Sequence, residues 1–355
     1  MKEIGSIFPL YSEDIALKGI QPTNEQRSDI RINYSLCREA MYAVAKKYEK
    51  SNKIVLIPAY TCQTVIDPFV QQGWKCFYYN IRKDLRIDTV DLIKLYKDVG
   101  PTMIVVHPFY GMELEQEEID ALTTIKLKGC VLMEDITQCI YTTNRHSIFA
   151  YVTGSYRKWF KIPDGGFVES HYLDGVEIPK ENNSEFVSKQ TDAMYLRGKY
   201  FNTGDEELKN ISIRLNKDAV AGTGKTISLH KMSNFSLMIM DKENKDTSMM
   251  RRLENYRHLF LNINSGKVKS VCSNIDDVTT SPLYFPIYVR DRACLQRRLA
   301  QDNVYAPILW PVNTDDVLIN DNIKEIYSTI LMIPIDQRYN VSDMSRIVKI
   351  INDYE

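Results

Sequence analysis

Short apolar segments that alternate with amphipathic ones are the feature that most constrains the fold of this chain. Residues 54–58 and 103–106 are uninterrupted apolar runs, and 131–135 is a third run that ends in two acids. Such runs, without polar alternation, are typical of strands buried on both faces of a parallel sheet. Segments of helical period separate them, at 59–70, 88–96 and 117–125. The alternation predicts an α/β fold whose mostly parallel sheet is covered by helices.

The regions outside this alternation predict an N-terminal arm and a second, smaller domain. Residues 1–30 contain prolines and glycines without a regular period, and we expect an irregular arm there. We place the large domain at 31–235 and a small C-terminal α+β domain at 236–355, because strands and helices follow a different order there. Two more expectations concern the middle of the chain: helix, loop and a mobile segment at 170–225, and a helical pattern at 227–261.

Composition excludes several classes of function. The 355 residues carry a net charge of -1, which gives no electrostatic reason to expect nucleic acid or an anionic membrane as a partner. No apolar run approaches the length that spans a bilayer, and the first residues lack the apolar core of a signal peptide. The seven cysteines are scattered, without a CxxC pair or a metal-ligand spacing. We therefore expect a cytoplasmic protein with free thiols and no metal site.

The strand at 131–135 and the turns after it carry the chemistry. Asp135 stands at the strand's carboxyl end, Lys158 follows about twenty residues later, and Asp164-Gly165-Gly166 lies just beyond. An aspartate can hold the proton of a pyridine nitrogen, and a lysine can hold an aldehyde as a Schiff base. The set therefore fits a pyridoxal phosphate site. Two alternatives stay open, since Asp135 could simply cap the next helix and Lys161 could be the reacting lysine.

The ordered set resembles a known family of enzymes. Glu134-Asp135, Gln138, Ser155, Lys158 and Asp164-Gly165-Gly166 are similar to the pattern of the DegT/DnrJ/EryC1/StrS sugar aminotransferases, a branch of the fold-type I pyridoxal phosphate enzymes. The resemblance covers most of the chain and is strongest from about 34 to 167.

The resemblance carries expectations about activity. It implies a pyridoxal 5'-phosphate-dependent aminotransferase in which Lys158 and Asp135 are catalytic. It implies that an amino acid, glutamate, donates the amino group to a nucleotide-linked keto-sugar in sugar or polysaccharide biosynthesis. It also implies a homodimer with its sites at the interface. Which sugar and which carbon are aminated does not follow from the sequence.

The resemblance further assigns ligands for the cofactor. Gln138 would lie near the ring hydroxyl and Ser155 would bind the phosphate. A helix that we expect to begin after Ser35 would place Cys37 and Arg38 at the phosphate, where free amide groups and the helix dipole favour an anion.

Other positions are assigned to the ring face and to the substrate. Cys62 matches a position that is often aromatic in the family; it cannot stack on the ring, so Tyr60 or His107 could replace it. His107 could equally be a hydrogen-bonded turn residue. The substrate positions in the C-terminal part are Tyr305, Trp310 and Arg338.

Two departures from the family pattern keep other functions open. The stretch from Ser155 to Lys158 is shorter than in the family, and Leu229 and Lys231 stand where family members tend to carry Asn and Arg. His230 and Lys231 could instead reach the partner's phosphate. The alternatives are another pyridoxal phosphate reaction on an amino-acid substrate, or a catalytically degenerate binding or scaffold protein on the same fold.

Overall fold

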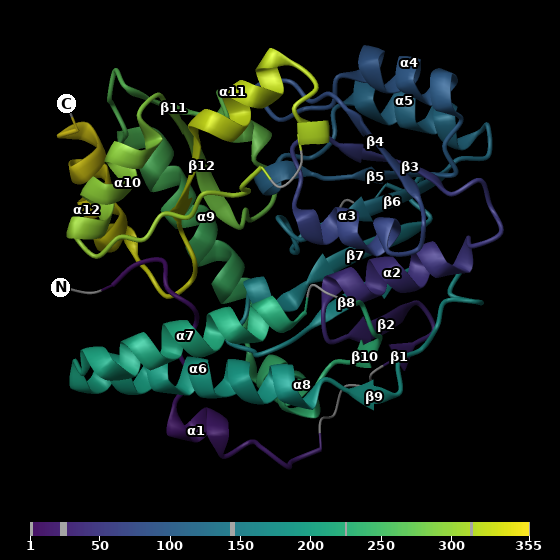
Figure 1. Cartoon of the computed structure of the whole chain (residues 1–355). Helices are drawn as coiled ribbons and strands as arrows, with labels where there is room; N and C mark the ends of the chain where they lie inside the picture. Colours follow the sequence, from purple (N-terminus) through teal and green to yellow (C-terminus); the bar gives the residue numbers. More distant parts are fainter. Residues whose placement is uncertain (1–2, 22–26, 143–145, 224–225, 313–314, 355) are drawn as a thin grey trace.

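The computed structural model describes residues 3–21, 27–142, 146–223, 226–312 and 315–354. Within these ranges the strands form one large sheet and one three-stranded sheet (Figure 1). Across the large sheet the order is β4 (Lys75–Tyr79), β3 (Ile54–Pro58), β5 (Met103–Val106), β6 (Val131–Asp135), β7 (Tyr151–Ser155), β8 (Gly166–Glu169), β2 (Arg31–Tyr34), β10 (His230–Lys231) and β9 (Glu181–Asn182). The short strand β1 (Arg27–Ser28) pairs with β2.

The large sheet is mostly parallel where the sequence predicts it. Strands β4, β3, β5, β6 and β7 run parallel to one another, whereas β8 is antiparallel to both of its neighbours, β7 and β2. The predicted α/β class is therefore confirmed. Because the carboxyl ends of parallel strands share one edge, Tyr60, His107 and Asp135 are gathered there.

Helices cover both faces of this sheet. Figure 1 shows α4 (Thr89–Val99) and α5 (Gln116–Lys126) on one side and α2 (Cys37–Lys47) and α3 (Gln63–Val70) on the other. Local sequence explains the limits of α4: the Asp88 side chain accepts a hydrogen bond from the Asp91 amide, and Gly100 ends the helix with φ +55°.

The region 170–225 differs from the expectation of helix, loop and mobile segment. Two long helices, α6 (Ser184–Thr203) and α7 (Glu206–Gly222), form an antiparallel hairpin (Figure 1). The buried stripe of α6 includes Gln190, Thr191 and Arg197, so its helical period is carried partly by polar residues. Hydrophobicity alone could not reveal this stripe.

The C-terminal part contains the second sheet. Its strands β11 (Val268–Ser270), β12 (Tyr284–Val289) and β13 (Ile330–Pro334) are antiparallel. Its helices are α9 (Lys245–Asn262), α10 (Arg292–Gln301), α11 (Asp321–Thr329) and α12 (Val341–Asn352). The helical pattern expected at 227–261 is divided, because α8 (Asn234–Lys242) ends before Asn244 caps α9. The domain boundary after residue 235 stays a prediction.

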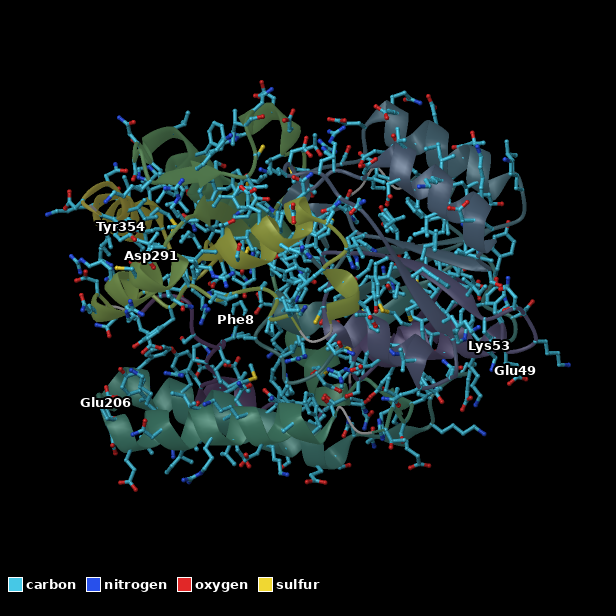
Figure 2. The ribbon with its side chains drawn as sticks, turned by 45° about the horizontal axis from the view of Figure 1, so that its top comes forward. Phe8, Glu49, Lys53, Glu206, Asp291 and Tyr354 are labelled. Atoms are coloured by element: carbon cyan, nitrogen blue, oxygen red, sulfur yellow. The ribbon has the colours of Figure 1, made fainter. Side chains whose placement is uncertain are left out.

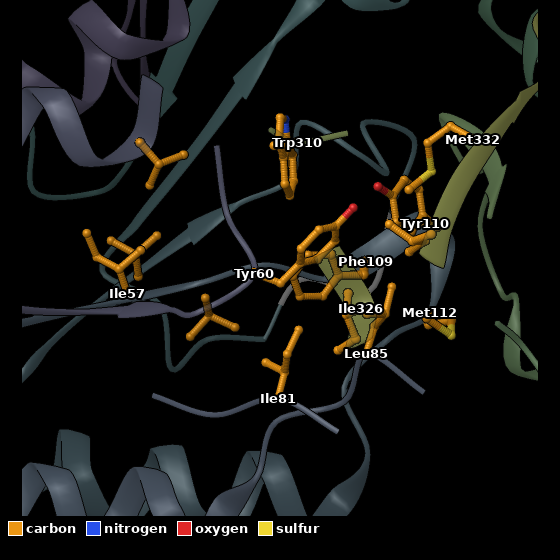
Figure 3. Close-up of a cluster of buried hydrophobic side chains, with 14 of the residues drawn as sticks. Ile57, Tyr60, Ile81, Leu85, Phe109, Tyr110, Met112, Trp310, Ile326 and Met332 are labelled. Atoms are coloured by element: carbon orange, nitrogen blue, oxygen red, sulfur yellow. The ribbon is translucent and has the colours of Figure 1, made fainter. Parts of the chain in front are cut away.

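One hydrophobic core extends between the two sheets. Figure 3 shows Tyr60, from the edge of the large sheet, packed against Phe109 and Trp310. The Tyr60 ring centroid lies 5.8 Å from that of Phe109 and 5.0 Å from that of Trp310. Ile326 of α11 and Met332 of β13 belong to the same cluster. The C-terminal part is therefore fixed against the edge that carries Asp135.

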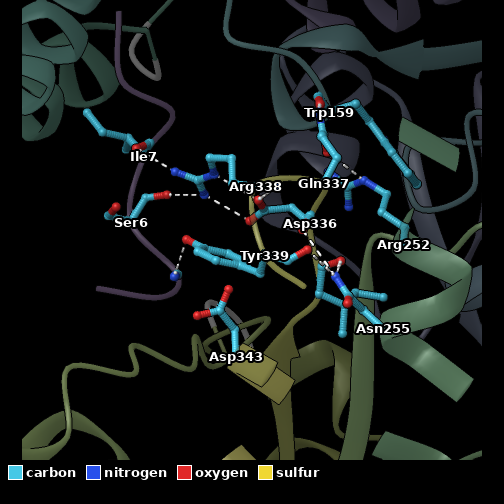
Figure 4. Close-up of polar contacts among 12 residues, drawn as sticks. Ser6, Ile7, Trp159, Arg252, Asn255, Asp336, Gln337, Arg338, Tyr339 and Asp343 are labelled. Carbon is cyan, nitrogen blue, oxygen red and sulfur yellow. Dashed lines mark hydrogen bonds and ion pairs between the residues drawn. The ribbon is translucent and has the colours of Figure 1, made fainter. Parts of the chain in front are cut away.

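The N-terminal arm packs against the C-terminal part of its own chain. It is irregular apart from the four-residue helix α1 (Ser12–Ile15). Ile4 exchanges backbone hydrogen bonds with Asn303 and Tyr305, at 2.9 and 2.8 Å. The Arg338 guanidinium donates to the carbonyls of Ser6 and Ile7 (Figure 4). Figure 2 shows Phe8, next in the arm, between the α6–α7 hairpin and the C-terminal part.

Candidate active site

A carboxylate and an imidazole meet at the carboxyl ends of two neighbouring strands. Val106 of β5 lies opposite Glu134 of β6, so His107 follows β5 beside Asp135. His107 Nδ1 lies 3.5 Å from Asp135 Oδ2. The other oxygen, Oδ1, accepts hydrogen bonds from the Thr137 amide at 3.0 Å and the Thr137 hydroxyl at 2.6 Å. In the described part of the chain, Oδ2 therefore has only this long contact.

The burial of His107 favours the neutral form of its ring. It is buried, and burial lowers its pKa even though the Asp135 charge acts in the opposite direction. Its Nε2 lies 2.9 Å from the Thr61 hydroxyl. Because a neutral imidazole does not compensate the carboxylate, Asp135 is left to attract another cation, such as a protonated pyridine nitrogen.

Lys158 stands on the turn that follows β7. The 3₁₀ helix η2 (Tyr156–Lys158) carries it, and the lysine is half-buried. Its charge acts on both the His107 imidazole and the Cys37 thiol, and the Asp135 charge acts on the same two groups. The next residue, Trp159, donates from Nε1 to the Thr137 carbonyl at 2.8 Å, which fastens the turn beside Asp135.

The rival lysine lies in a different environment. Lys161 Nζ forms an ion pair of 2.9 Å with Asp14 of α1. That pairing holds its amine at the N-terminal arm, and no described interaction links it to Asp135. The assignment of Lys158 as the reacting lysine stays a prediction.

The N-terminus of α2 begins next to β8. Its N-cap is Leu36, one residue later than expected, and no side chain caps it within the described residues. A Cβ on Gly166 would lie 2.2 Å from the Cys37 nitrogen, so only glycine allows this close approach. The uncapped amide groups of the first turn, together with Arg38, form the kind of end that binds an anion.

A buried carboxylate fixes the turn before Gly166. Asp164 accepts hydrogen bonds from the Ser233 amide at 3.0 Å, the Ser233 hydroxyl at 2.6 Å and the Ser236 hydroxyl at 2.5 Å. Burial raises the pKa of Asp164, and these hydrogen bonds counteract that effect. The Asp-Gly-Gly element is thus structural here: it positions the strand that faces the start of α2.

Four other residues assigned to the cofactor, Gln138, Ser155, Cys37 and Cys62, differ in their burial and hydrogen-bond partners. Gln138 is buried, and within the described residues its Oε1 has no hydrogen-bond partner. Ser155 is buried at the end of β7, and the Cys37 thiol lies 3.8 Å from the Thr137 hydroxyl. Cys62 is the N-cap residue of α3, and its sulfur accepts a hydrogen bond from the Thr64 hydroxyl at 3.0 Å.

Tyr60 and the three residues assigned to the substrate have contacts of their own. Tyr60 donates to the Leu309 carbonyl within the aromatic cluster that includes Trp310. Tyr305 lies near Lys209, with its hydroxyl 3.4 Å from Nζ. Arg338 forms an ion pair with Asp336 at 2.7 Å and also holds the arm (Figure 4). These contacts occupy the polar groups of Tyr60 and Arg338, and their roles toward a ligand stay predictions.

The segment assigned to the partner's phosphate faces α2 of its own chain. The carboxylate of Glu39 accepts hydrogen bonds from the His230 amide at 2.9 Å and lies 3.2 Å from His230 Nδ1. Burial raises the pKa of Glu39, and the hydrogen bond to Glu39 raises the pKa of His230. Lys231, in the same short strand β10, pairs with Tyr34 of β2.

Lys158 lines a cavity of about 480 Å³. The arm contributes Ser6 and Phe8, the α6–α7 hairpin contributes Gln190 and Asn216, and the C-terminal part contributes Asp336 and others. Arg157 and Arg252 also line it, and the sequence did not single out either as a ligand. Arg252 in particular lies far along the chain, so only the fold could reveal it.

The described ranges contain no helix that is both long and apolar enough to cross a membrane. They also contain no group of three or more His, Cys, Asp or Glu side chains that could hold a metal ion.

Comparison with known proteins identifies the fold. No family model and no curated protein sequence matches this chain. Solved structures do match, among them the sugar aminotransferase CalS13 from Micromonospora echinospora, with 14% identity over 99% of both chains and a TM-score of 0.70. A DegT DnrJ EryC1 StrS aminotransferase from Brucella abortus has 13% identity over 96% of this chain and 92% of its own, with a TM-score of 0.62. NtdA from Bacillus subtilis, with the cofactor PMP bound, has 17% identity over 90% of this chain and 72% of its own, with a TM-score of 0.61.

The chain therefore has the architecture of the fold-type I pyridoxal phosphate-dependent transferases, as the sequence predicted. Within that class, the structures it resembles are sugar aminotransferases of the DegT/DnrJ/EryC1/StrS type. At these identities the likeness establishes the fold, and the reaction is inferred from the site.

Proposed function

We propose that this protein is a pyridoxal phosphate-dependent aminotransferase that transfers an amino group from glutamate to a nucleotide-linked keto-sugar. The observation that carries the proposal is the place of the two residues in the fold: Asp135 ends β6, and Lys158 lies on the turn after β7, the neighbouring parallel strand. Both charges act on the His107 and Cys37 side chains. The likeness to sugar aminotransferases supports the choice of a sugar as acceptor.

The residues present fit pyridoxal phosphate. Asp135 Oδ2 would hold the ring nitrogen, Lys158 the aldehyde carbon, and the α2 N-terminus with Cys37 and Arg38 the phosphate. Gln138 supplies a buried amide oxygen without a partner among the described residues. When bound, the cofactor supplies a ring that withdraws electrons from the carbon attached to the substrate's amino group.

The protein's own groups supply orientation and proton transfer. The Asp135 carboxylate would hold a proton on the ring nitrogen of a bound cofactor, and His107, whose pKa is lowered by burial, would not compete for that carboxylate. Lys158 Nζ is the general base that takes the proton from the α-carbon of the amino donor, and it later returns a proton to the acceptor carbon. The arm and the α6–α7 hairpin border the cavity and limit the access of water to Nζ.

The remaining parts of the proposal rest on the likeness and on composition. They are a homodimer, a cytoplasmic location, a role in sugar or polysaccharide biosynthesis, and a division into an arm at 1–30, a large domain at 31–235 and a small domain at 236–355. Sedimentation of the purified protein tests the dimer, and limited proteolysis near residue 235 tests the division.

The decisive experiment is an absorbance spectrum of the protein with added pyridoxal phosphate, before and after borohydride. We expect a visible band in wild type that borohydride traps, and its loss in Lys158→Ala. Lys161→Ala is the matched control, because it removes a nearby lysine whose amine is paired with Asp14. If wild type shows no band with saturating cofactor, the enzyme proposal fails, and a catalytically degenerate binding or scaffold protein becomes the favoured interpretation.

Two further results would redirect the assignment. If Lys158→Ala keeps the trapped adduct and Lys161→Ala loses it, the reacting lysine is Lys161. If the band is present but isotope-labelled amine does not pass from glutamate to a keto-sugar nucleotide, the protein performs another reaction with the same cofactor.

A further inference from the structure

Pyridoxal phosphate requires a fixed spacing between the two residues that would hold it. Its ring nitrogen and the carbon that bears the aldehyde lie on opposite sides of a rigid aromatic ring, so their protein partners must be placed to within a fraction of an ångström. In this chain the partners come from different elements, since Asp135 ends β6 and Lys158 lies in η2, after β7. A contact between the end of β6 and η2 is therefore needed to set the spacing.

Thr137 makes hydrogen bonds to both of these elements. Its amide and its hydroxyl donate to Asp135 Oδ1, at 3.0 and 2.6 Å, and its carbonyl accepts from Trp159 Nε1 at 2.8 Å. Trp159 directly follows Lys158 in the chain. One buried residue thus binds the carboxylate with its hydroxyl and the turn of the lysine with its carbonyl.

The backbone that carries Thr137 is fixed on both sides. The Ile136 amide donates to the Thr153 carbonyl of β7 at 2.9 Å, and the Gln138 carbonyl accepts from the Leu283 amide at 3.0 Å. Both bonds join backbone groups, so they do not depend on the side chain of the threonine. A substitution that removes only the hydroxyl should therefore change the hold on the carboxylate and leave the backbone in place.

Trp159 is also held firmly. It is fully buried, and its carbonyl accepts a hydrogen bond from Gln337 at 2.7 Å (Figure 4). The Arg252 guanidinium lies 4.5 Å from the centre of its ring, and the Tyr141 ring lies at 5.2 Å and nearly perpendicular to it. These contacts direct the indole N–H at the Thr137 carbonyl and prevent the turn of the lysine from shifting.

The direction of the Thr137 hydroxyl is determined by its neighbours. A carboxylate accepts hydrogen bonds, so the hydroxyl donates its proton to Asp135. Cys37 Sγ lies 3.8 Å from the same hydroxyl oxygen, and burial raises the pKa of this thiol. The thiol therefore keeps its proton and can donate to the hydroxyl oxygen. The first turn of α2 is joined in this way to the carboxylate.

We propose that Thr137 is a positioning residue that fixes both protein partners of the cofactor. Its hydroxyl orients the Asp135 carboxylate toward the ring nitrogen, and its carbonyl sets the place of Lys158 through the Trp159 indole. This inference rests on the proposed function, because it assumes that the two partners hold pyridoxal phosphate. A donor on one carboxylate oxygen restricts rotation of the group and directs the other oxygen at the ring proton.

The test compares the binding of two forms of the cofactor by calorimetry. Pyridoxamine 5'-phosphate needs no bond to Lys158, whereas the aldehyde of pyridoxal 5'-phosphate condenses with the lysine amine and releases water. Thr137→Val loses the hydroxyl and keeps the shape of the side chain, so it should weaken the binding of both forms roughly tenfold. Trp159→Phe loses the indole N–H, so it should weaken the pyridoxal form roughly tenfold and the pyridoxamine form less than about twofold.

The nitrogen chemical shift of ring-labelled pyridoxamine phosphate reports on the ring proton itself. In Thr137→Val a poorly oriented carboxylate stabilises the protonated nitrogen less, so this nitrogen should lose its proton about one pH unit lower than in wild type. Thr137→Ser restores the hydroxyl and should return both the affinity and this pH toward wild type. Thr191→Val is the matched control and should change neither, because its buried hydroxyl donates to the Val187 carbonyl within α6 at 2.7 Å.

The possible results distinguish this inference from the proposed function. If wild type binds neither form, the proposed function fails and the role of Thr137 is refuted with it. If wild type binds both forms and folded Thr137→Val matches it, only the role of Thr137 is refuted. The role is also refuted if Thr137→Val loses thermal stability and affinity but keeps the wild-type pH, as a purely structural threonine would. If Thr137→Val does not fold, Trp159→Phe decides, since equal weakening of both forms would refute the role.

Discussion

Gly166→Ala should damage both stability and cofactor binding, because this glycine determines how closely α2 approaches β8. The added Cβ would lie 2.2 Å from the Cys37 nitrogen and 2.5 Å from the Leu36 carbonyl carbon. Both are backbone atoms, which cannot rotate away as the end of a side chain can. Ordinary contacts begin at 3.4 Å, so the start of α2 would have to retreat by about 1.2 Å, the difference between 3.4 and 2.2 Å.

The cost can be estimated from this displacement. Overpacking a well-packed interior costs about 1–3 kcal/mol, and a contact between backbone atoms belongs at the upper end. The smaller conformational entropy of the unfolded alanine variant offsets about 0.4–1 kcal/mol. We expect a net loss of about 2 kcal/mol in the free energy of unfolding. The affinity for pyridoxal phosphate should fall at least about tenfold, because amide groups moved by an ångström no longer reach the phosphate.

Urea denaturation and a pyridoxal phosphate titration measure the two effects. Gly222→Ala is the control, since a Cβ at that exposed end of α7 meets nothing within 4 Å. Alanine there should stabilise the protein by about 0.5 kcal/mol. If Gly166→Ala is as stable as Gly222→Ala, or binds the cofactor as wild type does, the close approach of α2 to β8 is not the reason for this glycine.

The remaining predictions concern two ion pairs. Asp336→Asn removes the buried carboxylate that pairs with the half-buried Arg338 and should cost about 3 kcal/mol in urea denaturation, at the lower end of the range for a buried pair. Asp302→Asn, at an exposed pair, should cost less than about 1 kcal/mol, and equal losses would contradict the argument. For His230, the hydrogen bond to Glu39 raises the folded pKa above the ordinary 6.5. The contribution of this pair to the free energy of unfolding, on the order of 1 kcal/mol, should therefore be complete below about pH 6.5 and disappear as the pH rises through the folded pKa. His230→Gln should remove this pH dependence from the urea midpoint. If the urea midpoint of His230→Gln varies with pH as that of wild type does, the pairing is refuted.

Local patterns were sufficient to predict the parallel half of the large sheet. The run that forms β6 is apolar and ends in Asp135, and Asp88 stands at the residue that caps α4. Each signal involves residues that are neighbours in the chain, and the physics of strands and caps acts at that range. The order of Asp135 and Lys158 along the chain could be predicted for a related reason, and the structure places them at the same edge, since β6 ends at Asp135 and the parallel neighbour β7 leads into the turn of Lys158.

Features that depend on tertiary packing could not be read from the sequence. The α6–α7 hairpin is joined partly by polar contacts, such as the 3.1 Å hydrogen bond between Gln190 and Asn216, which leave no hydrophobic period. The place of Arg252 in the cavity at Lys158 is visible only once the fold is known. His107 was predicted as a possible ring-stacking residue; the structure shows its contact with Asp135, and stacking on the cofactor stays a prediction.

The fastening of the arm has a consequence for how the protein is made. Residues 4 and 5 bond to residues 303, 305 and 339, so the arm cannot dock until these later residues have been synthesised. Ser6 and Phe8 line the cavity at Lys158, which therefore lacks a wall until then. Contacts between such distant residues form late and slowly. A nascent chain can complete the large sheet first, and the wall of the cavity is added afterwards.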